Sequence, residues 1–425
     1  MEPPVEHPGL THRPLLDLLV QLIVIIASAR IGGRAAGYFS QPRAVGEIVS
    51  GIGIGAILMS GLIPLPGPLV GMASSPTLGL LAGLGLVLVV FQIGIEFDFS
   101  HLRDRHNRRA TLFIATVGVI VPFGSGLGLG LLSWEPLASE ADRLTYALFV
   151  ATAFAITALP VLGRILIELD LHRTRIGTIA IAAAAVTDVI GWLLLGTVTA
   201  LTLARFSGPE LGLRIALVGA LGAMAWWLLR PALYRILGRA RLDEGGLPGD
   251  VMAVVLLAVL CAGALTEALG IYAVFGGFIA GVLLHDHGRF VAAWRWQVGG
   301  FVEVFFLPLF FTYTGMRLGV TDLNTGGLWS WCAVFVLAAM ASKLAGCWWA
   351  ARHTGLAEPE AVAMGFLMNT RGLMELVVLN VGLDLGVIPR SVFTMLVLMA
   401  VVSTVITCPL LQRVGMVRGV ALRGR

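Results

Sequence analysis

The sequence predicts an all-α membrane protein with about 13 transmembrane helices. The first observation is composition: of the 425 residues, 57% are hydrophobic and 13% are charged. A soluble domain carries roughly 25% charged residues, so this chain cannot cover a water-facing surface. That excludes a soluble enzyme, a nucleic-acid-binding protein and a disordered chain, and it indicates a multi-pass membrane protein. The other observations are the spacing of the apolar segments and the distribution of arginine between them.

The apolar residues gather in 13 segments of spanning or near-spanning length, at about 20 residues for each helix. The ninth segment is short and rich in glycine, so its boundary with the eighth is the least sharply defined, and apolarity alone gives 12 or 13. The segments cover residues 15–36, 44–63, 77–99, 110–132, 144–168, 176–204, 211–234, 250–269, 271–285, 298–318, 327–351, 359–384 and 390–412. Together they predict a membrane domain over residues 15–412.

Arginine is concentrated in the connections that follow odd-numbered segments. Arg30 and Arg34 lie in the last turns of the first segment and Arg43 follows it, whereas the connections after the second and eighth contain no arginine. Cytoplasmic loops of membrane proteins carry an excess of basic residues. The pattern therefore places residues 1–14 outside the cell, makes residues 413–425 a short cytoplasmic tail, and requires an odd number of helices, which favours 13.

Asp188 is the strongest candidate for a functional residue. It lies in the middle of the sixth segment, in IAAAAVTDVIGWLLLG. An ionisable side chain costs roughly 2.5–3.5 kcal/mol at such a depth on insertion scales. The alanines before Asp188 allow a neighbouring helix to approach closely. A buried carboxylate exchanges protons and is also a hard oxygen ligand for a monovalent cation; the alternative is a structural carboxylate bonded to another helix.

Lys343 is the single lysine among 29 basic residues, and it lies inside the apolar eleventh segment. Because every other basic residue of this set is arginine, the lysine at this position favours a requirement for an ammonium group there. Lys343 is a counter-charge for a buried carboxylate, a titrating amine, or a member of a structural ion pair.

The twelfth segment is interrupted near its centre by polar residues and a glycine. These are, in order, Asn369, Thr370, Arg371 and Gly372. They indicate an unwound segment that lines a cavity, because bare backbone groups cannot face lipid. Glu375 falls on the same helix face as Arg371 and is expected to pair with it. Arg371 either satisfies the ends of the broken helix or takes part directly in ion coupling.

The fifth segment contains Pro160, which removes a backbone donor and kinks or breaks a helix. Thr152 and Thr157 precede it, so a break here exposes carbonyl and hydroxyl groups of the kind that a dehydrated cation binds. The fifth and twelfth segments are seven apart and therefore cross the membrane in opposite directions. Interrupted helices at corresponding positions of two inverted halves are typical of the site of a secondary transporter.

The remaining polar positions are weaker candidates. Glu47 and Glu96 lie toward helix ends and are expected to be interfacial or architectural, and Glu267 and Glu303 are lesser still. The run His285–His287 either binds a metal, senses pH or lies solvated in a cytoplasmic connection, and the last is favoured. The four cysteines have no paired spacing, which argues against a disulfide framework or a zinc site.

Taken together, these residues resemble the monovalent cation:proton antiporters, in the branch of the plant cation/H+ exchangers and the bacterial Kef-type potassium transporters. The resemblance spans roughly residues 40–410. It is carried by QPRAVGEIVSGIGIG, AITALPVLGRIL, AAAAVTDVIGW and GFLMNTRGLMELVVLNVGLDLGVIP, of which the NTRGLMEL block is the most specific.

The resemblance implies two inverted repeats, a core domain in which two broken helices cross, and a dimerisation domain. Core helices are expected over about 110–204 and 327–412, and dimerisation or scaffold helices over about 15–99 and 250–318. The protein is accordingly expected to be a homodimer.

The family's site residues can be placed one by one on this sequence. The aspartate of the family's paired site residues falls on Asp188, and the first member of that pair falls on Thr187. The broken-helix threonine falls on Thr157, the helix lysine on Lys343, and the arginine of the TRG run on Arg371. Asp188 is then expected to bind K+ or Na+ or a proton, never both.

Thr187 departs from the family pattern, because electrogenic relatives have a second aspartate at this position. Electroneutral exchange of one proton for one cation is therefore expected. The alternative function is Na+-coupled transport of an organic solute on the same kind of fold, and Asp188 argues against it. A channel filter of the TVGYG type and the acid pair or HExxH set of an intramembrane hydrolase are both missing from the sequence.

We expect an integral protein of a bacterial plasma membrane, with the lipid bilayer as its surroundings, no cofactor and no nucleic-acid partner. The tail after the last segment is about a dozen residues long. No nucleotide-binding regulatory domain like that of the longer Kef-type proteins is therefore expected.

Overall fold

The computed structural model describes residues 14–39, 41, 43–60, 67–69, 71–96, 105–168, 171, 174–203, 216–217, 219–239, 246–269, 272–318, 323–324 and 326–413. All regular secondary structure within these residues is helical, and helix occurs in each of the 13 predicted segments. The prediction of an all-α protein is confirmed. The predictions for residues 1–13 and 414–425 concern positions outside the described residues.

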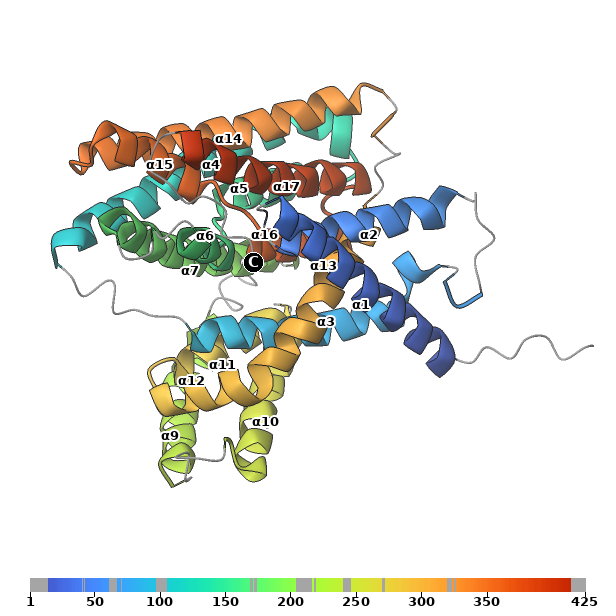
Figure 1. The fold of residues 1–425 in the computed structure, drawn as a ribbon, viewed down its shortest axis with the longest axis vertical. Coiled ribbons are helices and arrows are strands. Elements are labelled where there is room, and N and C mark those ends of the chain that lie inside the picture. Colours follow the sequence, from blue (N-terminus) through green and yellow to red (C-terminus); the bar gives the residue numbers. More distant parts are fainter. Residues whose placement is uncertain are drawn as a thin grey trace, which may run out of the picture.

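One group of helices contains both broken segments and occupies the upper and middle parts of Figure 1. It consists of α4 (Arg105–Ala138), α5 (Arg143–Ala155), α6 (Leu159–Glu168), α7 (Arg175–Leu203), α14 (Leu328–His353), α15 (Glu358–Met368), α16 (Leu373–Asp384) and α17 (Arg390–Arg413). α4 packs on α5, α7 and α14, and α14 packs in turn on α15 and α17. Buried apolar side chains of α4, α6, α7, α14 and α15 form a cluster of their own at the centre of this group.

A second group of helices occupies the lower and right-hand parts of Figure 1. It consists of α1 (Pro14–Tyr38), α2 (Arg43–Ser60), α3 (Pro76–Ile95), α9 (Arg230–Arg239), α10 (Gly249–Ala268), α11 (Ala273–Leu284), α12 (Gly288–Trp294) and α13 (Leu307–Met316). α2 packs between α1 and α13, and α11 packs between α3 and α10. Glycines allow the closest of these approaches: a Cβ added at Gly94 of α3 would lie 2.9 Å from Gly281 Cα of α11.

The chain between α12 and α13 is irregular. It contains two π-helical stretches, Arg295–Gly299 and Val302–Phe306, and the helix axis bends there by 47°. π-helical turns are rare and occur frequently at functional sites. A third stretch, Ala225–Leu229, leads into α9. The second group of helices is therefore less regular than a simple bundle.

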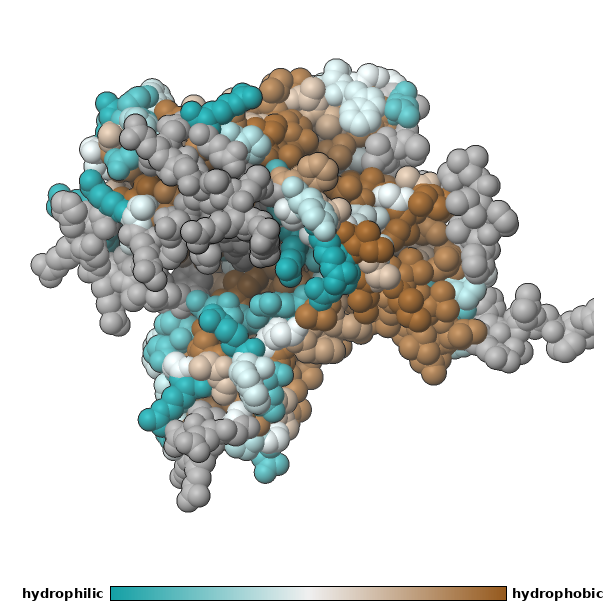
Figure 2. Space-filling model, viewed as in Figure 1, coloured by the Kyte–Doolittle hydropathy of each residue, from teal (hydrophilic) through white to brown (hydrophobic). Residues whose placement is uncertain are grey.

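Eight helices of the described residues are long and apolar enough to cross a membrane, and the bent pair α12–α13 would make nine. The number is below 13 because some of the predicted segments are divided or short; α5 has 13 residues and α11 has 12. Large apolar side chains on α1, such as Leu15, Leu19 and Ile23, are exposed. Figure 2 shows the surface over α1 and α2 as a hydrophobic area, the expected character of a face that contacts lipid tails.

Candidate ion-binding site at two crossing helix breaks

The first break lies between α5 and α6. α5 ends at Ala155, residues 156–158 are not helical, and α6 begins at Leu159. Pro160 is the second residue of α6, where a proline is tolerated because the first turn of a helix has no internal partners for its N–H groups. The proline therefore lies in the first turn of the second half-helix, and the break falls just before that helix.

The second break lies between α15 and α16, at residues 369–372. Gly372 is required there by space: a Cβ at this position would lie 2.8 Å from Val161 Cγ2 and 3.3 Å from Ala158 Cβ. Both of these neighbours belong to the chain around the first break. The two breaks are therefore in close contact.

Hydrogen bonds join the two breaks directly. The Ala158 amide donates to the Thr370 carbonyl at 3.0 Å, and the Thr157 hydroxyl donates to the Met368 carbonyl at 3.1 Å. Both threonines are fully buried. The crossing that the resemblance implied thus lies at Thr157–Ala158 and Met368–Thr370.

Two cationic side chains cover the carboxyl end of α5. The Arg371 guanidinium donates to the Ala153 carbonyl at 2.5 Å and to the Phe154 carbonyl at 3.1 Å. The Lys343 ammonium donates to the Ala155 carbonyl at 2.5 Å and to Gly118 of α4 at 2.7 Å. The last carbonyls of a helix lack internal partners and carry partial negative charge. Arg371 and Lys343 supply these carbonyls with hydrogen-bond donors and with positive charge, in a place that water does not reach.

Arg371 also forms a buried ion pair with Glu375, as their spacing predicts. Arg371 Nη1 lies 3.2 Å from Glu375 Oε1, and neither side chain is exposed to solvent. The second carboxylate oxygen of Glu375 is buried and has no hydrogen-bond partner among the described residues. The charge of Glu375 is therefore matched by Arg371, while one of its oxygens stays uncommitted.

Asp188 lies on α7 beside the amino end of α6. The side chain is 4% exposed, and the Leu159 backbone amide is a hydrogen-bond partner of its carboxyl group. Asp188 Oδ1 is buried, and nothing in the described part of the chain bonds to it. The amino end of a helix favours negative charge. Asp188 therefore completes the start of α6 and keeps one oxygen available for a proton or a cation.

The other predicted site residues surround the crossing in different ways. The Thr187 hydroxyl donates to the Ala184 carbonyl of its own helix at 2.9 Å. Asn369 is buried, and its Oδ1 has no partner among the described residues. Within those residues no ion pair joins Lys343 to Asp188, since the ammonium is bonded to carbonyl groups. The sequence singled out Lys343 but could not identify main-chain oxygens as the partners of its ammonium group.

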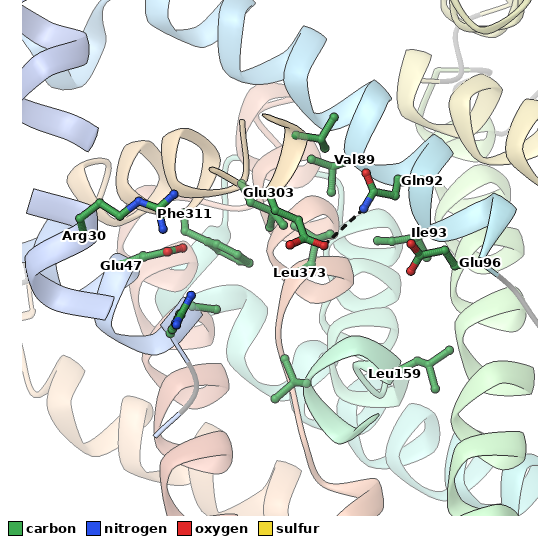
Figure 3. Close-up of a pocket in the computed structure, with 15 residues that line it drawn as sticks. Arg30, Glu47, Val89, Gln92, Ile93, Glu96, Leu159, Glu303, Phe311 and Leu373 are labelled. Carbon is green, nitrogen blue, oxygen red and sulfur yellow. Dashed lines mark hydrogen bonds between the residues drawn. The ribbon is translucent and has the colours of Figure 1, made fainter. Parts of the chain in front are cut away.

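A cavity of about 400 Å³ reaches the crossing from one side (Figure 3). Its lining includes Leu159 and Leu373, the first residues of α6 and α16, and Leu159 is the residue whose amide bonds Asp188. The polar residues of the lining are Arg30, Arg43, Glu47, Gln92, Glu96 and Glu303. Gln92 donates to Glu303 at 3.5 Å, which joins α3 to the π-helical stretch of residues 302–306. Sequence reasoning placed Glu47 and Glu96 at helix ends but did not assign them to a shared cavity.

The remaining candidates lie elsewhere. Glu267 accepts a hydrogen bond from the Ala273 amide at 2.7 Å. Asp286 accepts hydrogen bonds from Arg230, at 2.5 Å, and from Tyr234. Within the described residues no group of three or more His, Cys, Asp or Glu side chains is arranged to hold a metal ion.

The fold and the crossing breaks define a class, the secondary transporters whose site is built from discontinuous membrane helices. The family description "Sodium/hydrogen exchanger, transmembrane" matches residues 22–415, and the chain belongs to this family. The chain is 35% identical to the Na(+)/H(+) antiporter NhaS4 of Synechocystis sp., over 94% of this chain and 97% of that one. It is therefore a membrane cation/proton antiporter and not an enzyme, and the family resemblance predicted from the sequence is confirmed.

Other relatives are longer than this chain. The K(+)/H(+) antiporter 1 of Saccharomyces cerevisiae is 32% identical over 94% of this chain but only 46% of its own length. The chain spans about half the length of the plant and yeast relatives it matches. Among solved structures, the sodium proton antiporter MjNhaP1 from Methanocaldococcus jannaschii has the same fold, with a TM-score of 0.64 at 15% identity over 94% of this chain and 96% of that one.

The pairing of Arg371 with Glu375 predicts the stability of variants. Arg371→Gln leaves a buried carboxylate without its partner and uncovers the end of α5, and breaking a buried pair costs about 3–5 kcal/mol. We expect a strong fall in the unfolding temperature of the purified protein in detergent. Adding Glu375→Gln removes the uncompensated charge, so the double variant should be more stable than Arg371→Gln alone. A double variant destabilised by the sum of the two single effects would contradict the pairing.

Proposed function

We propose that the protein exchanges Na+ or K+ for protons by alternating access, with Asp188 as the shared binding site. The observation that carries the proposal is the position of Asp188: a buried carboxylate with one uncommitted oxygen, bonded to the amide of a residue that lines the cavity. A carboxylate with one available oxygen accepts a proton or a cation but does not hold both. Thr157 and Asn369 lie at the crossing and offer further oxygen ligands.

The coupling between the two fluxes follows from the cost of moving a bare charge. An unoccupied carboxylate is expensive to carry across an apolar barrier. Asp188 loaded with a proton or a cation is neutral, so only the loaded protein changes its access. Each movement in one direction then carries a cation, and each return carries a proton.

The stoichiometry follows from the residues beside Asp188. Thr187 has a hydroxyl group where a second aspartate would add a charge, and that hydroxyl bonds its own helix. Glu375 is a second buried carboxylate, but Arg371 matches its charge. One proton for one monovalent cation is therefore the proposed ratio, and the exchange is electroneutral.

The two groups of helices suggest how access alternates. We assign α4–α7 and α14–α17 to a moving core, and α1–α3 and α10–α13 to a scaffold that forms a homodimer in a bacterial plasma membrane. Arg30 of α1 and Arg43, the first residue of α2, line the cavity and belong to the arginine-rich end that we assign to the cytoplasm. The cavity is accordingly the cytoplasmic access route to Asp188, with the N-terminus outside and the C-terminus in the cytoplasm.

Replacing Asp188 tests the site. Asp188→Asn keeps the size of the side chain but removes the group that carries a proton or a charge, so we expect exchange to fall to the level of empty liposomes. The measurement is cation-induced dequenching of a pH-sensitive dye in proteoliposomes, across Li+, Na+, K+ and Rb+. Asp250→Asn, at an exposed position in the first turn of α10, is the matched control and should behave as wild type. Exchange at the wild-type rate by a folded, monodisperse Asp188→Asn protein would disprove the assignment.

Membrane potential tests the stoichiometry. With valinomycin and K+ clamping the potential and Na+ as the transported cation, an electroneutral exchanger should show the same initial rate at every potential. The rate should vary by less than about 20% between 0 and −100 mV, because moving one net charge would contribute about 2.3 kcal/mol over that range. A steep dependence on potential would show that a further group moves charge.

Lys343 is expected to tune the site without being part of it. Its ammonium bonds carbonyl groups, so no step of the proposed exchange requires it. Lys343→Gln should still exchange, with a pH optimum moved upward, because a nearby positive charge favours the ionised form of Asp188. Lys343→Arg retains the charge and should shift the optimum less. The pH profiles of both variants decide this, and a folded Lys343→Gln protein with no exchange at any pH would make Lys343 part of the coupling machinery.

A further inference from the structure

Thr404 of α17 holds the backbone of the second break at one point. Its hydroxyl accepts a hydrogen bond from the Arg371 amide at 3.1 Å and donates one to the Arg371 carbonyl at 2.8 Å. The side chain is 2% exposed. A threonine inside a helix commonly bonds a carbonyl one turn earlier on its own helix. Thr404 instead satisfies both main-chain groups of one residue in an unwound segment, where lipid offers no partner.

The position of Thr404 in the chain matches that of Asp188. Asp188 lies on α7, the helix that follows the first broken pair, 29 residues after Leu159 begins α6. Thr404 lies on α17, the helix that follows the second broken pair, 31 residues after Leu373 begins α16. Asp188 bonds the Leu159 amide, and Thr404 bonds the backbone of Arg371, two residues before α16. Each side chain thus holds the backbone beside the start of the second half-helix.

The difference between the two side chains is chemical. A carboxylate changes its charge and its hydrogen bonds when it exchanges a proton for a cation, whereas a hydroxyl does not titrate at physiological pH. The second break therefore keeps the same bonds in both loaded states. From this fixed backbone the Arg371 guanidinium reaches the Ala153 and Phe154 carbonyls at the end of α5. Thr404, which holds the second break, thereby also orients the end of α5 at the first break.

We propose that Thr404 is a positioning residue for cation/proton exchange, the neutral counterpart of Asp188 in the second repeat. It fixes the Arg371 backbone. Arg371 in turn holds the end of α5, and with it the first break, in position relative to Asp188. This inference rests on the proposed function of Asp188. Thr404 acts through Arg371 and the α5 carbonyls, and the two hydrogen bonds of its hydroxyl are both to the Arg371 backbone in the second break.

Substitution of Thr404 tests the proposal through the cation KM and kcat of exchange in proteoliposomes. Thr404→Val keeps the shape and removes both hydrogen bonds, each worth about 0.5–1.5 kcal/mol net. The expected result is a cation KM raised about tenfold with kcat within about threefold of wild type. Thr404→Ser restores the hydroxyl and should return KM to within twofold of wild type.

A neighbouring residue supplies the matched control. Ser403 is buried beside Thr404, and its hydroxyl has no partner among the described residues. Ser403→Ala should therefore exchange like wild type. Should Thr404→Val yield no folded protein, Thr404→Cys keeps the volume with a weaker hydrogen-bonding group, and its KM should lie between those of the serine variant and a tenfold increase.

The path of the effect is tested by combining variants. Arg371→Lys removes the guanidinium that bonds two carbonyl groups. Adding Thr404→Val to this variant should therefore raise the cation KM by less than a further factor of two. Additive effects would show that Thr404 does not act through Arg371. A wild-type KM in Thr404→Val or Thr404→Cys, or a serine variant as impaired as the valine variant, would overturn the proposal. A failure of the proposed function gives a different result: Asp188→Asn would then still exchange, whatever the Thr404 variants do.

Discussion

Two helix breaks inside a membrane leave main-chain N–H and C=O groups that no water can satisfy, and covering these groups is the constraint on which the site depends. The solution follows the polarity of the helix ends. At the carboxyl end of α5, where carbonyls are free, Arg371 and Lys343 bring positive charge. At the amino end of α6, Asp188 brings negative charge to an amide. Thr404 serves the backbone of the second break with a neutral hydroxyl.

In the proposed exchange, transport depends on the uncommitted oxygen of Asp188. Lys343 and Arg371 each bond two carbonyl groups, although Arg371 Nε has no partner among the described residues, and Asp188 keeps one carboxylate oxygen without a partner there. The cavity is lined in part by Leu159, whose amide bonds the Asp188 carboxyl group. In the proposed mechanism, a proton or a cation from the cavity binds Asp188, a group that already stabilises the broken helix. Binding would thereby be linked to the geometry of the break through that one side chain.

The sequence predicted the site where it places charge against the apolar background. Asp188, Lys343 and Arg371 were found because each interrupts a hydrophobic segment, and the second break was found from polar residues beside Gly372. The sequence could not supply the main-chain partners, because carbonyl oxygens are the same at every residue. A single threonine such as Thr404 is likewise ordinary in a helix until the break that it touches is placed in space. The all-helical membrane character was predicted well because apolar length depends on the chain alone, whereas only eight helices of the described residues, or nine with the bent pair, are long and apolar enough to span.

The carboxylates that line the cavity show most clearly what the sequence alone cannot predict. Glu47 and Glu303 lie 256 residues apart and share a cavity only because α2 packs on α13. No periodicity reports such a contact, and none reports the 47° bend in the chain before α13. Local signals thus locate the groups that a bilayer makes costly, and tertiary structure decides which of them meet.

The most direct measurement of the central claim, that a proton and a cation compete for Asp188, is proton release on cation binding. Na+ or K+ is added to the purified protein in weakly buffered detergent solution, and the released protons are counted with a pH indicator. If a proton and a cation compete for Asp188, the release rises to a maximum of one proton for each cation bound, at a pH where Asp188 is protonated before the cation is added, and Asp188→Asn releases none. Cation binding by the wild-type protein without proton release at any pH would contradict it.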